Sequence, residues 1–196
     1  MVRIHLFNTP SPDYIWVYAL VAPFPTLRYE MTGDELLQIW NGSSETTWRI
    51  LVDKSTREVF TTLWGEPASE TVRVVSAGEM LEITWAEKNT LAIIPFEEIS
   101  PRWKVLKVDG QSPLGAELLL EEYPLVAQFN WEGRIPRGQD KIHLLREAGF
   151  QGTNRDESKL TRVLLTGTTA LVRSTAERMA TMGIDYPAGD ILPTLL

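Results

Sequence analysis

The chain has 196 residues, of which 43% are hydrophobic and 23% charged, and this composition is typical of a globular protein rather than a disordered one. Its net charge is −7, from 19 Lys and Arg against 26 Asp and Glu, and no basic stripe follows the sequence, which argues against a nucleic acid as partner. The absence of cysteine excludes disulfides, thiolate metal sites and cysteine nucleophiles together.

The longest uncharged apolar stretch, residues 15–26, is shorter than the roughly 20 residues that a membrane-spanning helix needs. The N-terminal segment contains Arg3, but it lacks the continuous apolar run and the small-residue cleavage site of a secretory signal. We therefore expect no membrane span and no signal segment in this chain. It is either cytoplasmic or exported by a segment outside it.

Short apolar strands alternate with capped helices over the first 110 residues. The strands are expected at 16–22, 49–52, 72–75, 91–94 and 104–108. Three helices are expected to begin at capping boxes led by Thr32, Ser55 and Ser76, each followed three residues later by a glutamate. This alternation predicts an α/β domain with a mainly parallel sheet and flanking helices.

The pattern becomes less regular after residue 114. A strand is expected over 123–130 and a helix over 140–148, and the polar stretch 151–159 predicts a linker or an exposed loop. A further strand over 160–165 and a helix over 169–182, ended by Gly183, are expected after it. The last apolar residues have no expected partner, which predicts that the chain ends within a domain.

The start of the second expected helix is the best local candidate for a ligand site. Lys54, Ser55 and Thr56 follow a strand directly, where unpaired backbone N–H groups and the positive end of the helix dipole meet. Two hydroxyls and an ammonium add further donors, so the position suits a small anion. The alternative is that Ser55 only caps the helix and Lys54 is solvated.

Other signals for chemistry are weak. His5 and His143 are the only histidines, and neither has the spacing of a metal site. Because no phosphate loop, serine elbow or nucleophile–base pair is present either, we expect no catalytic residue, no metal and no cofactor. The adjacent carboxylates Glu97 and Glu98 are expected to be solvated surface residues.

The seven tryptophans allow a hypothesis of ligand stacking. Trp40, Trp64 and Trp85 each lie on the apolar face of an expected helix, however, which favours packing in the core. Trp103 and Trp131 lie in less regular sequence and are freer to face a cleft.

Two stretches resemble known families. Residues 160–191 (LTRVLLTGTTALVRSTAERMATMGIDYPAGDI) closely resemble the opening of the catalytic-type domain in CapA-family poly-gamma-glutamate (capsule) synthesis proteins. Residues 15–114 resemble the region that precedes this domain, which is similar to a lobe of a type 2 periplasmic substrate-binding protein. The strings YALVAPFP at 18–25 and VDGQSPL at 108–114 carry that second resemblance.

The resemblance implies a periplasmic-binding-like domain over 1–150, a polar linker over 151–159 and an incomplete CapA-like domain over 160–196. CapA-type domains are similar to calcineurin-like metallophosphatases and begin with a Gly-Asp pair that supplies a metal ligand. Gly167 and Arg173 match family positions, but Thr168 stands where the aspartate is expected. Because a threonine hydroxyl cannot replace a carboxylate ligand, we expect no catalysis from this chain alone.

The function that follows is non-catalytic binding of a small or polymeric anion, such as a glutamate-type capsule polymer, at Lys54, Ser55 and Thr56. The resemblance implies an extracytoplasmic or membrane-associated location. Phosphate-binding relatives carry a Ser-Gly-Thr turn at the matching loop, and its absence argues against phosphate itself. Two alternatives stay open: part of a metallophosphatase-like enzyme completed by residues beyond Leu196, and a module that docks on other capsule-assembly proteins.

Overall fold

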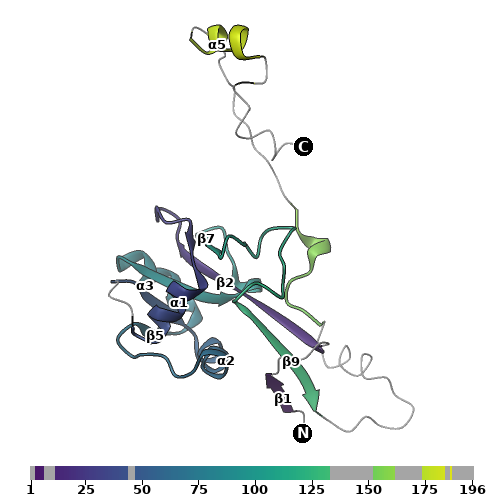
Figure 1. Ribbon diagram of the computed structural model, residues 1–196. Helices are drawn as coiled ribbons and strands as arrows, with labels where there is room; N and C mark the ends of the chain where they lie inside the picture. Colours follow the sequence, from purple (N-terminus) through teal and green to yellow (C-terminus); the bar gives the residue numbers. More distant parts are fainter. Residues whose placement is uncertain are drawn as a thin grey trace, which may run out of the picture. The chain divides into compact units, whose positions relative to one another are not determined.

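The computed structural model describes residues 3–6, 12–43, 47–132, 152–161, 174–183 and 186 (Figure 1). The chain forms two compact units, Met1–Leu160 and Thr161–Leu196. In the second unit the structure describes helix α5 (Ser174–Met182), which ends at Gly183 with a positive φ of 102°, as the sequence predicts. Most of the strand expected over 160–165 and the whole helix expected over 140–148, with His143, lie outside the described residues.

A mixed sheet forms the centre of the first unit. Among the described residues it has seven strands: β1 (Arg3–Leu6), β2 (Tyr14–Pro23), β4 (Arg49–Val52), β5 (Val72–Val74), β6 (Thr90–Pro95), β7 (Trp103–Val105) and β9 (Val126–Glu132). Their order is β1-β9-β2-β6-β4-β5, and β7 also pairs with β2. Two short strands, β3 (Glu30–Met31) and β8 (Lys107–Val108), pair separately in parallel.

The α/β class with flanking helices is confirmed, and parallel pairing in this sheet is confined to β5, β4 and β6. Ile50 in β4 lies opposite Val72 in β5 and Leu91 in β6. Strand β2 runs antiparallel to β6, β7 and β9. The reason is that helical crossovers, which parallel neighbours need, join β4 to β5 and β5 to β6 only.

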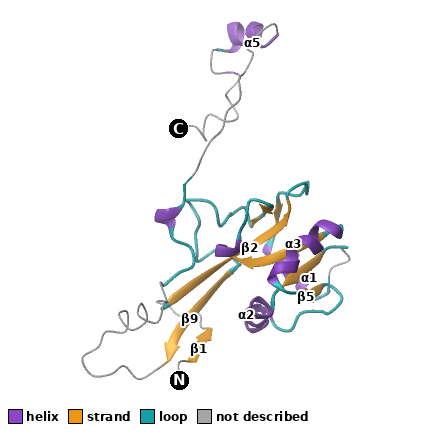
Figure 2. Cartoon of the chain, turned by 180° about the vertical axis from the view of Figure 1, so that it is seen from behind, coloured by secondary structure: helices purple, strands orange, loops and turns teal. Residues whose placement is uncertain are grey.

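Helices cover both faces of the parallel part of the sheet (Figure 2). Helices α1 (Gly33–Trp40) and α2 (Lys54–Trp64) pack on one face, and α3 (Ala77–Ala86) packs on the other. Side chains of β2 alternate between the two clusters, so Leu20 faces α1 and α2 while Val21 faces α3. Both cores therefore share the same central strand.

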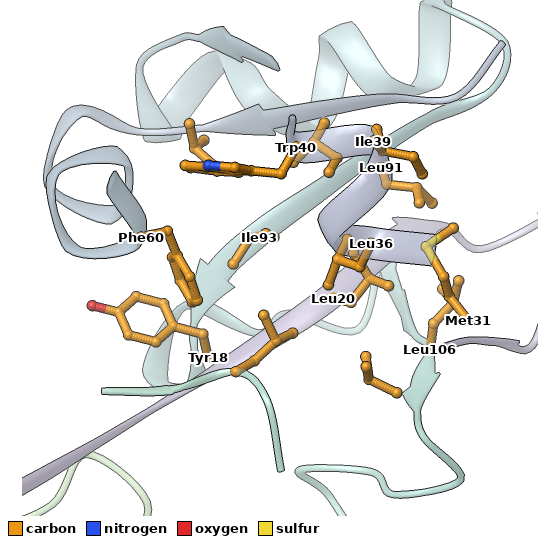
Figure 3. Packing of buried hydrophobic residues seen from close by; sticks show 14 of the residues in the cluster. Tyr18, Leu20, Met31, Leu36, Ile39, Trp40, Phe60, Leu91, Ile93 and Leu106 are labelled. Atoms are coloured by element: carbon orange, nitrogen blue, oxygen red, sulfur yellow. The ribbon is translucent and has the colours of Figure 1, made fainter. Parts of the chain in front are cut away.

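The larger cluster packs aromatic residues beside aliphatic ones, as Figure 3 shows. Trp40 and Phe60 are fully buried, and Trp40 donates its indole N–H to the carbonyl of Gly65 over 2.9 Å. The ring of Tyr18 lies edge-on to Phe60, with 5.0 Å between the ring centroids. Trp64 packs on Trp40 in the same way, so the expected core role of these two helical tryptophans is confirmed.

The capping box expected at Thr32 forms in the structure, and the one expected at Ser76 does not. At α1 the Thr32 side chain accepts from the backbone N–H of Glu35, and the Glu35 carboxylate accepts from the backbone N–H of Thr32, as predicted. Ser76 is the first residue before α3, but its hydroxyl bonds to the carboxylate of Glu79 and forms no cap with the backbone. That box is therefore incomplete.

The polar stretch expected to be a linker packs against the first unit in its described residues, 152–160. The side-chain amide of Asn154 accepts from the backbone N–H of Val17 and donates to its carbonyl, over 2.7 and 2.9 Å. Arg155 is 4% exposed and donates to the carbonyls of Pro113 and Gly115. Asn154 and Arg155 thus satisfy main-chain groups of distant segments, whereas Glu157, Ser158 and Lys159 are exposed.

Candidate functional site

The candidate site lies where two parallel strands end. The chain leaves β4 at Asp53 and enters α2, and it leaves β6 at Pro95 and enters the short 3-10 helix η1 (Phe96–Glu98). Since β4 and β6 are neighbours, the two exits lie at the same edge of the sheet. Ligands of open α/β sheets bind in crevices outside these carboxyl ends.

A cavity of about 320 Å³ opens at this edge. Its volume is at the lower end of the range for small-molecule sites. Its lining comes from β2, from α2, from the end of β6 with η1, and from β9. The lining residues are Tyr14, Trp16, Tyr18, Ser55, Pro95, Glu97, Glu98 and Phe129.

Asp53, and not Ser55, is the N-cap of α2, so the expected capping box at Ser55 is wrong. The Asp53 backbone is extended, and its carboxylate accepts from the backbone N–H of Thr56 and from the hydroxyl of Ser55, each over 2.7 Å. Burial alone would raise the pKa of Asp53, but the hydrogen bonds from Thr56 and Ser55 outweigh it and hold this pKa below its usual value. A carboxylate here also meets the positive end of the helix dipole.

The three site residues expected from the sequence do not converge on one point. Ser55 lines the cavity. Thr56 is fully buried, and its backbone N–H already binds Asp53. The side chain of Lys54 is 87% exposed, with its ammonium 4.0 Å from the carboxylate of Glu58 one turn along α2. Their joint role in ligand binding stays a prediction.

The electrostatic character of the cavity is acidic. Burial raises the pKa of Glu98, and the negative charges of Asp53 and Glu97 raise it further. Burial is also the main reason why the pKa of Tyr18 is raised, with the same two carboxylates adding to the shift. The Tyr18 hydroxyl therefore stays protonated at neutral pH and remains a donor. Figure 3 shows this hydroxyl directed away from the labelled core residues.

A contact from the end of the first unit fixes one of these carboxylates. The side-chain amide of Asn154 donates to Glu97 over 2.5 Å while it also binds the backbone of Val17 in β2. Glu97 is thus tied to the central strand and is not a freely solvated side chain, although it is exposed. Glu97 and Glu98 are both exposed, as the sequence predicts, but the contact of Glu97 with Asn154 was not predicted.

Sequence reasoning also missed the aromatic side of the cavity. Tyr14, Trp16 and Tyr18 occupy alternate positions of β2 and all line the cavity. Trp16 and Tyr18 belong to a segment predicted only as a buried strand, and Tyr14 lies before that predicted strand. An aromatic residue at every second position of one strand is the signal that could have identified a shared aromatic face.

The other tryptophans have mixed outcomes. Trp85, expected in the core, is 46% exposed and lines a second cavity of about 640 Å³ together with Trp48. Trp103, which was expected to be freer to face a cleft, is partly buried and packs against the smaller core cluster. The side chain of Trp131 lies outside the described residues.

The family-motif positions Gly167, Thr168 and Arg173 lie outside the described residues. Within the described part of the chain, no group of three or more His, Asp or Glu side chains could hold a metal ion. No helix described by the structure is both long enough and apolar enough to cross a membrane.

Comparison with solved structures identifies the fold. The chain is similar to an ABC-type phosphate transport receptor from Vibrio cholerae, with a TM-score of 0.53 and 15% identity over 74% of this chain and 65% of that one. It is also similar to a putative phosphate ABC transporter substrate-binding protein with bound phosphate from Clostridium perfringens, with a TM-score of 0.53 and 13% identity over 74% of this chain and 71% of that one.

The expected likeness to the fold of substrate-binding proteins is confirmed by these two structures. The chain spans 65% of the length of the Vibrio receptor. No protein-family model and no curated protein matches the chain. Neither solved structure bears on the CapA resemblance of residues 160–191, which stays a prediction.

Proposed function

We propose that this chain is a non-catalytic binding module for a small ligand that carries an anionic group. The observation that carries the proposal is the position of Ser55, which lines a cavity of about 320 Å³ at the carboxyl ends of β4 and β6. This is the position where folds of this type hold their ligands. The two similar solved structures, a phosphate transport receptor and a substrate-binding protein with bound phosphate, support a small anion.

The donors available to the ligand are few. The hydroxyls of Ser55 and Tyr18 come from residues that line the cavity, and the ammonium of Lys54 extends from the same turn of α2. The Asp53 carboxylate already uses the backbone N–H of Thr56 and the hydroxyl of Ser55. Since Ser55 must give up a hydrogen bond to bind a ligand, we expect weaker binding than at a helix start with unpaired donors.

The proposal extends to a biological setting. The resemblance of residues 160–191 to CapA-family proteins supports a module of a poly-gamma-glutamate (capsule) synthesis protein that acts outside the cytoplasm. In that setting the ligand is a glutamate-type precursor or the end of the capsule polymer. The sequence of residues 160–191 is the support for this biological setting, and the fold of the first unit is compatible with it.

Calorimetric titration of the full chain tests the proposal. The probes are inorganic phosphate, sulfate, glutamate and oligo-γ-glutamate, and we expect binding heat from at least one of them. The double substitution Lys54→Ala and Ser55→Ala is expected to weaken that binding by about tenfold, which corresponds to about 1.4 kcal/mol. Flat heats for all four probes, with the protein folded, would overturn the proposal.

A matched control comes from the chain itself. Ser158 and Lys159 are an exposed Ser-Lys pair in the short 3-10 helix η2 (Glu157–Lys159), and the Ser158 hydroxyl bonds to the N-cap Asp156 as Ser55 does to Asp53. The double substitution Ser158→Ala and Lys159→Ala removes the same groups away from the cavity. It should leave the affinity unchanged, and an equal loss in both variants would contradict the assignment to Ser55.

A further inference from the structure

Besides Ser55, the cavity of about 320 Å³ is lined by aromatic and acidic side chains. Its lining includes four aromatic side chains from β2 and β9, namely Tyr14, Trp16, Tyr18 and Phe129. Glu97 and Glu98 also line it, and the described lining residues include no lysine and no arginine. The cavity is therefore both aromatic and negatively charged.

These two properties select the same kind of ligand group. The face of an aromatic ring carries negative potential and attracts a cation, most strongly where water is excluded. A carboxylate forms short, charge-assisted hydrogen bonds with an ammonium group. A ligand with negative charge alone, by contrast, meets repulsion from Glu97, Glu98 and the nearby Asp53.

We propose that the ligand of this cavity also carries an ammonium group, which Glu97 and Glu98 bind while the carbon skeleton packs against the aromatic rings. The ligand class is then an amino acid, or the amino end of a short acidic chain. This inference rests on the proposed function, because the anionic end of the same ligand remains at Ser55 and Lys54.

The acidic side of the cavity is preorganised for such a group. Glu97 is fixed by the Asn154 amide, which is itself held by two hydrogen bonds to Val17 in β2. Burial raises the pKa of Glu98, and the negative charges of Asp53 and Glu97 raise it further, so its ionised form is repelled by these two neighbours. An ammonium group relieves that repulsion. The volume of about 320 Å³ accommodates one amino acid and not a folded segment.

Titration with chemically matched probes tests the inference. Glutamate and glutarate share the carbon chain and both carboxylates, and they differ only in the ammonium group. We expect glutamate to bind the full chain about tenfold more tightly than glutarate at pH 7. The double substitution Glu97→Gln and Glu98→Gln, which keeps the side-chain size, should remove this preference. Glu121→Gln with Glu122→Gln, an exposed adjacent pair, is the matched control.

Each outcome separates the two proposals. Equal binding of glutarate, phosphate and glutamate, unaffected by the Glu97 and Glu98 substitutions, would overturn the proposal that the ligand carries an ammonium group. The proposed anion-binding function would stand. Binding of methylammonium, but of no anionic probe, would overturn the proposed anion-binding function. It would support recognition of an ammonium group by this cavity. No heat from any probe, with native tryptophan fluorescence, would overturn both.

Discussion

Removing the guanidinium of Arg155 should destabilise the first unit strongly. The side chain is 2% exposed, and its Nε and one terminal nitrogen donate to the carbonyls of Pro113 and Gly115 over 2.7 and 2.5 Å. The other terminal nitrogen lies 2.5 Å from the carboxylate of Glu157. The substitution Arg155→Met keeps much of the apolar length and removes every donor, so two carbonyls on the 113–115 loop lose their partner.

The magnitude follows from these contacts. A buried acceptor that loses its partner costs about 1–3 kcal/mol, which gives a range of about 2–6 kcal/mol for the two carbonyls. The ion pair adds little, because the Glu157 carboxylate is 62% exposed and is screened by water. Methionine also avoids the desolvation cost of a buried charge. We therefore expect a loss of about 2–4 kcal/mol in the free energy of unfolding.

Urea unfolding of the full chain, followed by tryptophan fluorescence, measures this loss. All seven tryptophans lie in the first unit, so the signal reports that unit alone. Lys159→Met, at a side chain that is 72% exposed, is the control and should change stability by less than about 0.5 kcal/mol. A loss below about 0.5 kcal/mol for Arg155→Met, at an unchanged urea dependence, would refute the structural role of Arg155.

The remaining predictions concern stability and pH. Thr32→Ala removes a formed cap and should cost about 1 kcal/mol in urea unfolding, whereas Ser76→Ala should cost less than about 0.5 kcal/mol; equal losses would contradict the capping geometry. Phe60→Ala in the fully buried cluster should cost about 3–5 kcal/mol by the same measurement. Because the pKa of Glu98 is raised above 4.5, its stabilising contribution is complete below that pH and is lost as pH rises through the folded-state pKa. Glu98→Gln should therefore raise the melting temperature at pH 7 and lose this advantage near pH 4.

Local signals predicted the regular elements well. The expected strand over 49–52 has the bounds of β4, and the helix expected to begin after Thr32 has the cap that its sequence indicates. Both depend on neighbours within a few residues, because a buried strand and a capping box are defined by their own side chains. The fold class followed from the alternation of these elements.

The N-cap of α2 shows where local information ends. Asp53 and Ser55 are both favourable N-caps, and the box pattern with Glu58 favoured Ser55. The helix begins two residues earlier because β4 ends at Val52, and Asp53 is the first residue free to leave the sheet. The choice was made by strand pairing, which one short motif does not encode.

The distant contacts of the polar segment 152–160 were missed for a similar reason. Its partners are separated from it by 137 residues for Val17 and 42 residues for Pro113. Composition describes how a segment interacts with water, but it does not reveal that its side chains satisfy backbone groups elsewhere. The cavity depends on the same kind of distant contact, since its lining residues come from four separate parts of the chain.

The position of the site and the identity of the ligand are therefore set by different residues. Parallel pairing of β4 and β6 creates the crevice whatever side chains line it. Asp53 occupies donors that the start of α2 would otherwise offer to an anion, and Glu97 with Glu98 adds negative charge beside it. We therefore expect a ligand with its own positive or proton-donating group to be favoured in this crevice, and the fold alone does not predict a bare oxyanion here.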